Sequence, residues 1–137
     1  MIHRPYPPAS AGAPDERRRQ YGDLAEMTQK NTAFRRVVYT VPGQLQVVLM
    51  SVRERIDWEE HSQATQFFYI VQGIARITKS GQTVPELVQP GGFSVITPGT
   101  LHLVENASPG SGLLKLYTLY SPPQHKSDAV EFIRKSP

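Results

Sequence analysis

Two short segments of the chain carry side chains that could bind a metal ion. In the first, DWEEHSQATQFFYIVQG, Glu59 and His61 lie two positions apart and Gln66 follows at the start of an apolar run. Side chains two residues apart on a β-strand project from the same face, so we expect Glu59 and His61 to point into the same interior. In the second, TPGTLHLVEN, His102 lies in a short strand just after a Pro-Gly turn.

This donor set favours one divalent metal ion without selecting which. Glu59, His61 and His102 supply two imidazoles and one carboxylate, the set that binds Fe(II) on one face of an octahedron and leaves positions open. Gln66 would add a neutral oxygen ligand. The chain has no cysteine, so thiolate ligands and disulfides are excluded. Zn, Mn, Fe and Ni all remain candidates, and chemistry on a carbonyl, enediol or carboxylate, or oxygen activation, would suit such a centre.

The elements that must position these residues are strands. From Phe34 onward the chain alternates β-branched or aromatic segments with Gly, Pro and Asn turns, which predicts an all-β sandwich or barrel. Residues 53–58 are expected to be a polar connection. The predicted strands cover residues 35–41, 44–52, 66–71, 74–78, 84–88, 93–96, 101–104 and 113–120, and the segment that contains Pro85 is expected at an edge.

The two ligand segments resemble, in altered form, the paired motifs of the cupin superfamily. In the first motif Glu59 and Gln66 take the places of the usual histidine and carboxylate. The matching positions are Glu59, His61, Gln66 and Gly73 in the first motif, and Gly91, Thr97, Gly99, His102 and Asn106 in the second. Three further sequence segments also resemble those of a branch of small single-domain cupins of mostly unassigned function: NTAFRRVVYT, QFFYIVQG and LKLYTLYSPPQH.

The resemblance implies a double-stranded β-helix, the cupin jelly-roll barrel, over residues 31–125. Residues 1–30 are expected to form a flexible arm rich in Pro and Arg, although residues 21–31 could contain one or two helical turns. Residues 126–137 are expected to be a tail or a short helix, which could start with Ser127 as its cap.

For the site, the resemblance implies a metal ion on Glu59, His61, Gln66 and His102. The activity that it suggests is metal-assisted isomerisation of a sugar or a similar small oxygenated metabolite. A non-heme iron dioxygenase and a non-catalytic cupin that binds small molecules or acts as a scaffold remain alternatives. Strand periodicity leaves the pocket lining open; the candidates are Phe68, Ile70, Arg76 and Tyr117. No individual catalytic residue follows from the sequence, and His125 is expected at the surface or at a subunit contact.

Composition limits the partners. The formal net charge is +3, and residues 1–36 account for it with seven Lys or Arg against four Asp or Glu, whereas the rest of the chain holds eight of each. Three consecutive arginines, Arg17 to Arg19, lie beside Asp15 and Glu16 and are only a weak indication of nucleic-acid binding, so nucleic acid is an unlikely partner. We expect a cytoplasmic protein with no membrane segment, which binds a small-molecule ligand and forms a homodimer.

Overall fold

The computed structural model describes residues 21–132, and in this part of the chain strands predominate over one short helix. The elements are α2 (Leu24–Lys30), β1 (Arg35–Val41), β2 (Leu45–Val52), β3 (Arg55–Glu59), β4 (Thr65–Gln72), β5 (Ala75–Lys79), β6 (Glu86–Val88), β7 (Phe93–Ile96), β8 (His102–Asn106), β9 (Leu114–Ser121) and β10 (Val130–Glu131).

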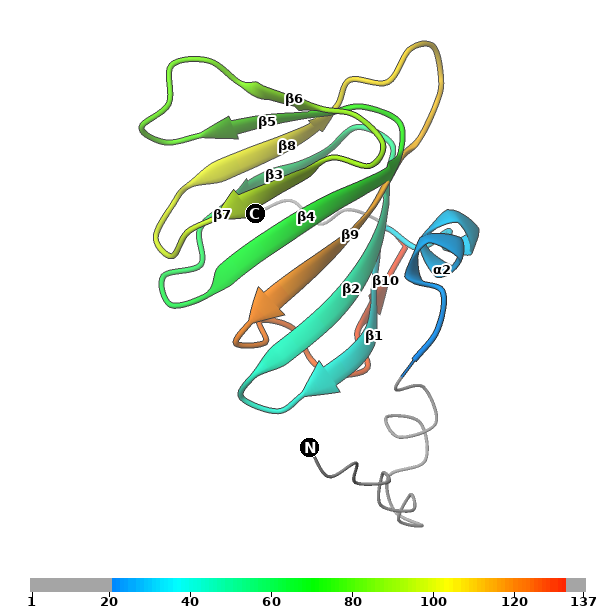
Figure 1. The fold of residues 1–137 in the computed structure, drawn as a ribbon, viewed down its shortest axis with the longest axis vertical. Helices are drawn as coiled ribbons and strands as arrows, with labels where there is room; N and C mark the ends of the chain where they lie inside the picture. Colours follow the sequence, from blue (N-terminus) through cyan, green and yellow to red (C-terminus); the bar gives the residue numbers. More distant parts are fainter. Residues whose placement is uncertain (1–20, 133–137) are drawn as a thin grey trace, which may run out of the picture.

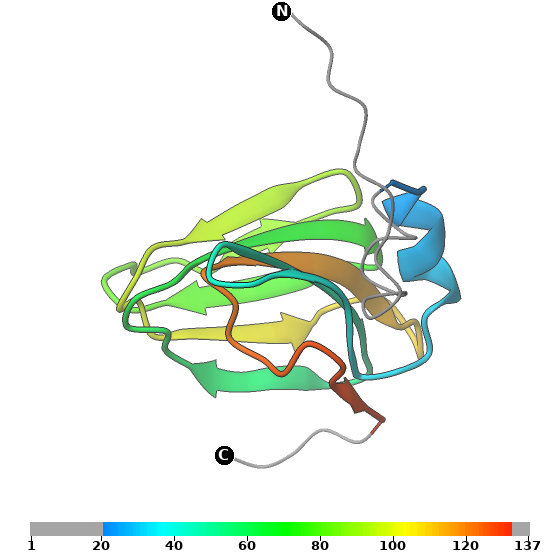
Figure 2. The ribbon, with the colours of Figure 1, turned by 90° about the horizontal axis from the view of Figure 1, so that it is seen from below.

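The strands form two antiparallel sheets that face each other (Figures 1 and 2). The larger sheet has the order β10-β1-β2-β9-β4-β7, and the smaller has the order β3-β8-β5-β6. Strands distant in sequence lie side by side, because β9 is hydrogen-bonded between β2 and β4. This arrangement is a double-stranded β-helix, so the predicted fold class is confirmed.

Alternating side chains fill the space between the sheets. On β4, Gln66, Phe68 and Ile70 are buried while the residues between them are partly exposed. The same period of two gives β9 the inward residues Leu116 and Tyr120. A period of two places every second side chain in one core, and the apolar interior therefore follows directly from the strand pattern.

Helix α2 belongs to the folded domain. Asp23 caps its first turn by accepting a hydrogen bond from the Glu26 amide at 3.0 Å. At the other end Lys115, which points outward from β9, donates from Nζ to the carbonyl oxygens of Gln29 and Asn31. The expected helical turns are confirmed, whereas assigning residues up to 30 to a flexible arm is wrong from Leu24 onward. The rest of the expected arm, residues 1–20, lies outside the described residues.

One other local prediction is wrong. The expected connection at residues 53–58 contains most of strand β3, because Ile56 turns inward to the core while its neighbours stay at least partly exposed. Of the segment expected to be a tail or a short helix, the described residues up to 132 contain no helix but the short strand β10, which pairs with β1 through Arg35 and Glu131. An ion pair between these two side chains supports the strand pairing. Over residues 21–132 no helix is long and apolar enough to cross a membrane.

Candidate metal centre

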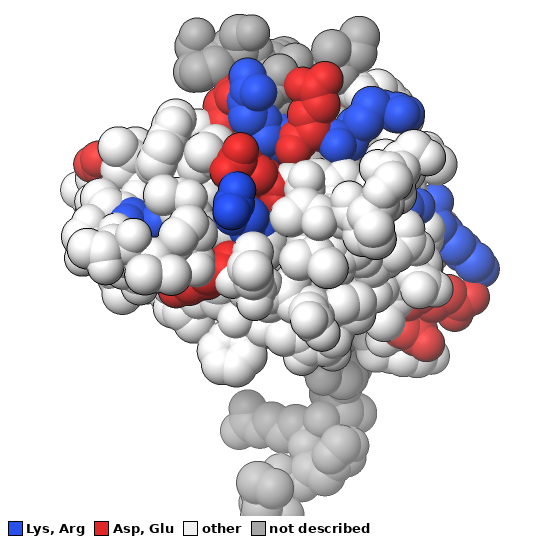
Figure 3. Space-filling model, turned by 90° about the horizontal axis from the view of Figure 1, so that it is seen from above, with Lys and Arg blue, Asp and Glu red and all other residues white. Residues whose placement is uncertain are grey.

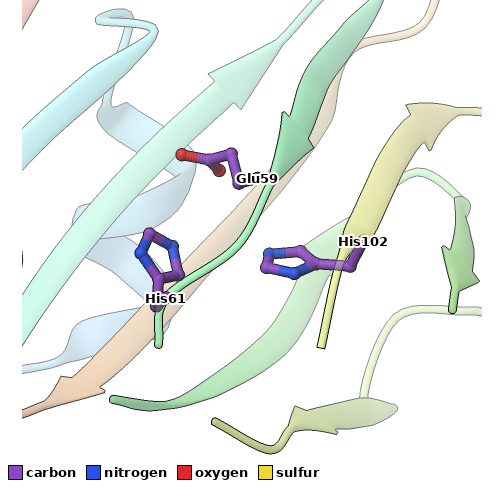
Figure 4. A group of neighbouring side chains, drawn as sticks. All are labelled: Glu59, His61 and His102. Atoms are coloured by element: carbon purple, nitrogen blue, oxygen red, sulfur yellow. The ribbon is translucent and has the colours of Figure 1, made fainter. Parts of the chain in front are cut away.

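The structure brings the three ionisable residues among the predicted ligands into one cluster. Ligand atoms of Glu59, His61 and His102 all lie within 4.8 Å of one another (Figure 4). Glu59 ends β3, His61 lies in the loop that follows, and His102 begins β8. Glu59 and His102 are direct cross-strand partners, so the two motifs meet through sheet pairing.

The turn of the second motif also holds the first motif in place. The amide of Gly99 donates a hydrogen bond to the carbonyl oxygen of His61 at 2.9 Å. Gly99 has φ +79°, a left-handed conformation that favours glycine. Beside it, the hydroxyl groups of Thr97 and Thr100 are hydrogen-bonded at 2.9 Å. The loop that carries His61 is therefore fixed by the turn that precedes His102.

A backbone contact fixes the protonation pattern of His102. Its Nδ1 lies 2.9 Å from the carbonyl oxygen of Thr100. A carbonyl oxygen can only accept, so the neutral ring carries its proton on Nδ1 and its lone pair on Nε2. Nε2 has no hydrogen-bond partner. In metal sites, histidine ligands are commonly oriented by a backbone carbonyl that accepts a hydrogen bond from the ring nitrogen that does not bind the metal.

Buried polar atoms without partners gather on the predicted ligands. Unpaired buried groups are rare and costly in folded proteins. Across the described residues, the buried side-chain nitrogen and oxygen atoms without a hydrogen bond are Arg35 Nε, Glu59 Oε1, His61 Nε2, Gln66 Oε1 and His102 Nε2. Four of these five atoms are potential metal donors, one from each residue that the sequence singled out. Their residues therefore fit a bound cation, which would satisfy the acceptors together.

Gln66 differs from the other three candidates because its side chain is a neutral amide. It is almost fully buried on the inner face of β4, opposite Tyr120 on β9. Its Nε2 donates to the Thr118 hydroxyl at 3.0 Å. This contact holds the nitrogen away and leaves Oε1 unpaired, so the amide is oriented with its oxygen available.

The electrostatics favour neutral imidazoles. Burial lowers the pKa of His61, and the nearby Arg35 charge lowers it further, while a hydrogen bond with Gln124 acts in the opposite direction. Burial also lowers the pKa of His102, against the effects of the Thr100 carbonyl and Glu59. Burial raises the pKa of Glu59, and the Arg35 and His102 charges partly offset this. Neutral histidines are the form that binds metal.

Arg35 is a site residue that the motifs do not reveal. It comes from β1, is 8% exposed, and its Nη1 donates to Glu131 Oε2 at 2.9 Å. Its Nη2 lies 3.7 Å from Glu59 Oε2. That separation is longer than a hydrogen bond. The arrangement places a fixed positive charge beside the candidate ligand Glu59.

Tyr120 and His125 form another part of the site, and neither belongs to the two motifs. The ring of Tyr120 is fully buried and packs edge-on against His61, with ring centres 5.2 Å apart. Its hydroxyl lies 3.4 Å from His125 Nε2. The backbone of His125 is held by Gln46, which accepts from its amide at 3.0 Å and donates to its carbonyl at 2.8 Å. His125 is partly buried against Tyr120, and the expectation that it lies at the surface or at a subunit contact stays a prediction.

The expected pocket residues divide between the two faces of the sheets. Phe68 and Ile70 are buried inside, and the Phe68 ring lies 6.1 Å from that of His102. Arg76 is exposed between buried Ala75 and Ile77. Tyr117 lies on the outer side of β9, stacked on Tyr69. Placing Arg76 and Tyr117 in the pocket is wrong, because a strand pattern alone cannot say which alternate set faces inward.

Asn106, the last residue of the second motif, has a structural role. Its side-chain nitrogen lies 2.9 Å from the Arg53 carbonyl oxygen and 2.8 Å from that of Gly112. Its side-chain oxygen accepts from the Ser108 amide at 2.9 Å. Asn106 thus ties together the loops before β3 and before β9, at a distance from the candidate ligands along β8.

No protein-family model matches the sequence. Among curated proteins, the chain is 36% identical over 115 residues to an uncharacterised protein of Acanthamoeba polyphaga mimivirus, an alignment that covers 82% of this chain and 71% of that protein. It is also 36% identical over 123 residues to the uncharacterised protein YrkC of Bacillus subtilis, covering 79% of this chain and 64% of YrkC. These relatives carry no assigned activity to compare.

Solved structures identify the fold family. The protein BH2720 of Bacillus halodurans is 31% identical with a TM-score of 0.77, and the match covers 86% of this chain and 92% of that one. An RmlC-like cupin with a double-stranded β-helix fold from Methanocaldococcus jannaschii is 13% identical with a TM-score of 0.59, covering 69% and 84%. A cupin-2 domain protein from Shewanella frigidimarina is 21% identical with a TM-score of 0.55, covering 69% and 86%. With this arrangement of strands, the chain has the cupin fold, a double-stranded β-helix.

Proposed function

We propose that this protein is a metal-dependent cupin that catalyses isomerisation of a small oxygenated metabolite, such as a sugar. The main observation in favour of a metal site is that Glu59, His61, Gln66 and His102 each have one buried donor atom without a hydrogen-bond partner. A divalent ion on these residues would act as a Lewis acid toward a carbonyl or enediol oxygen. Gln66 would supply its amide oxygen as the fourth, weaker ligand.

Residues next to the candidate ligands could bind the substrate. Burial, together with the charges of Arg35 and His61, lowers the pKa of His125 to about 4, so its ring is neutral near pH 7. Burial raises the pKa of Tyr120, which keeps its hydroxyl protonated. These two neutral groups, 3.4 Å apart beside the site, could hydrogen-bond an oxygen of the substrate; a proton transfer through them would need the bound metal ion or substrate to bring their pKa values toward neutral pH.

The decisive experiment measures metal content and turnover together. We expect near-stoichiometric metal in the purified, untagged full chain by elemental analysis. The Glu59→Ala and His102→Ala variants should lose it, because each removes a donor that no other described group replaces. Glu60→Ala is the matched control, since Glu60 is the exposed neighbour of Glu59, and this variant should keep its metal.

The same samples separate the proposed reaction from its alternatives. Isomerisation requires conversion of aldoses or hydroxy ketones without oxygen uptake. Oxygen consumption by the iron-loaded protein would instead support a dioxygenase. Metal absent from the wild type after reconstitution with Zn, Mn, Fe and Ni would overturn the metal site and leave a non-catalytic binding or scaffolding cupin.

A further inference from the structure

The Arg35 guanidinium has two hydrogen-bonding edges, and only one of them makes a close hydrogen bond within the described residues. Nη1 is paired with Glu131 at 2.9 Å. On the opposite edge Nε is buried without a partner, and Nη2 comes no closer than 3.7 Å to Glu59 Oε2. Nε and Nη2 of a guanidinium point their hydrogens in parallel, which is the geometry that a carboxylate accepts with both oxygens.

The open edge faces the candidate metal centre. Arg35 acts electrostatically on Glu59, His61, Tyr120 and His125, which belong to the site or touch it. The side chains of Glu59 and Glu131, which flank the Arg35 guanidinium, are 23% and 20% exposed, whereas that of Arg35 is 10% exposed. The donor atoms of the two histidines are buried. Solvent therefore reaches the two carboxylates that flank Arg35.

The charges leave room for a single negative group. Glu59 and Glu131 offset the Arg35 charge and one charge of a divalent ion, so one positive charge remains. A carboxylate would neutralise it, whereas a doubly charged phosphate would leave the partly buried site negative. The planar shape of a carboxylate also matches the parallel Nε and Nη2 hydrogens.

From this arrangement we infer that the ligand of this protein carries a carboxylate, which binds the Nε and Nη2 edge of Arg35 while another of its oxygens faces the metal. The inference rests on the proposed metal-dependent function and narrows its substrate class to small hydroxy or oxo acids. Arg35 is a specificity-determining residue in this view, and Glu131 positions it.

Lactate and 1,2-propanediol are a suitable probe pair, because they share a skeleton and a hydroxyl group and differ in the carboxylate. We expect metal-loaded full-length protein to bind lactate on the order of tenfold or more tightly than propanediol, since hydrogen bonds to charged groups are strong. Arg35→Gln should remove this preference, and Arg35→Lys should restore part of it by charge alone. Glu131→Gln should weaken lactate binding, because it removes the ion pair that positions Arg35.

Arg36→Gln is the matched control, because the Arg36 guanidinium lies on the outside, 5.9 Å from the centre of the Phe132 ring, and this variant should keep the lactate preference. Calorimetric titration gives the affinities, and metal content and thermal unfolding are measured on every sample. Equal binding of the two probes, or a preference that survives Arg35→Gln in folded, metal-loaded protein, would overturn the inference. If the wild type takes up no metal, the proposed metal-dependent function fails. Lactate binding by the metal-free protein that is lost in Arg35→Gln would still support the carboxylate site. If the metal-free protein does not bind lactate, the carboxylate site is overturned as well.

Discussion

Gln66 on β4 donates its side-chain hydrogen bond to the hydroxyl of Thr118 on β9, 3.0 Å away, which fixes the direction of its unpaired Oε1. Thr118 is fully buried and belongs to neither of the two motifs. One hydroxyl thus decides which end of an amide faces the interior, although it lies 52 residues away along the chain.

Replacing Thr118 tests this relationship. Thr118→Val keeps the shape of the side chain but leaves Gln66 Nε2 buried without an acceptor. We expect the free energy of unfolding to fall by about 1–3 kcal/mol, measured by urea denaturation of the metal-free protein. Thr118→Ser, which keeps the hydroxyl, should lose clearly less. Equal losses in the two variants would mean that packing of the methyl group, and not the hydrogen bond, is what matters.

Gln66 itself can be tested as a metal ligand. Gln66→Glu would place a second carboxylate next to the cluster, so we expect tighter metal binding and a less stable metal-free protein, because like charges are then buried together. Gln66→Leu should weaken metal binding without removing it. Metal titrations followed by thermal unfolding measure both effects. Unchanged metal affinity in both variants would remove Gln66 from the ligand set.

His125 should make the metal-free protein sensitive to acid. Its pKa is about 4 in the folded chain against 6.5 when unperturbed, because burial and the Arg35 and His61 charges outweigh the effect of Glu131. Between these pH values the unfolded chain binds more protons, so stability should fall as pH drops from 6.5 toward 4. Denaturant unfolding of the wild type and of His125→Gln between pH 6.5 and 4 measures this fall in the free energy of unfolding. The fall should be smaller in the variant. Parallel curves would contradict a depressed pKa.

The two motif glycines should differ in how they tolerate a side chain. Both have positive φ, +82° at Gly73 and +79° at Gly99. A Cβ at Gly73 would lie 2.3 Å from Ser108 Oγ and 2.7 Å from the Leu113 carbonyl oxygen, whereas one at Gly99 would meet nothing within 4 Å. Gly99→Ala should therefore cost only the backbone penalty of about 1–2 kcal/mol, and Gly73→Ala distinctly more. Thermal unfolding of the two variants measures the loss of stability. Equal losses would show that the loop containing Ser108 moves to accommodate the added methyl group.

We expect two copies of the chain to associate through the outer face of the larger sheet. Phe67 stacks on Phe93 and Tyr69 on Tyr117 there, and Phe93 is 61% exposed. Seen from above, a broad part of the surface carries no Lys, Arg, Asp or Glu side chain (Figure 3). A face of stacked aromatic rings suits self-packing of two sheets.

Light scattering tests this association. The wild type should be a dimer and Phe93→Asp a monomer. Leu87→Asp is the control, since Leu87 is similarly exposed but lies on β6 of the other sheet. A monomeric wild type, or the same effect from both variants, would rule out this face.

The sequence by itself determined the fold class and the residues of the cluster. Alternating apolar strands with Gly and Pro turns specify an all-β barrel because the period of two is a local property. The spacing of Glu59, His61 and His102 within the two motifs was enough to identify them as candidates, since Glu59 and His102 are brought opposite each other by the pairing of β3 with β8.

Only the tertiary structure decided which other side chains enter the site. Arg35 and Tyr120 belong to strands whose pattern permits either face, and the same ambiguity misplaced Arg76 and Tyr117. His125 reaches Tyr120 because Gln46, 79 residues away along the chain, holds its backbone. Strand pairing and long-range hydrogen bonds set these positions, and neither is encoded in the spacing of neighbouring residues.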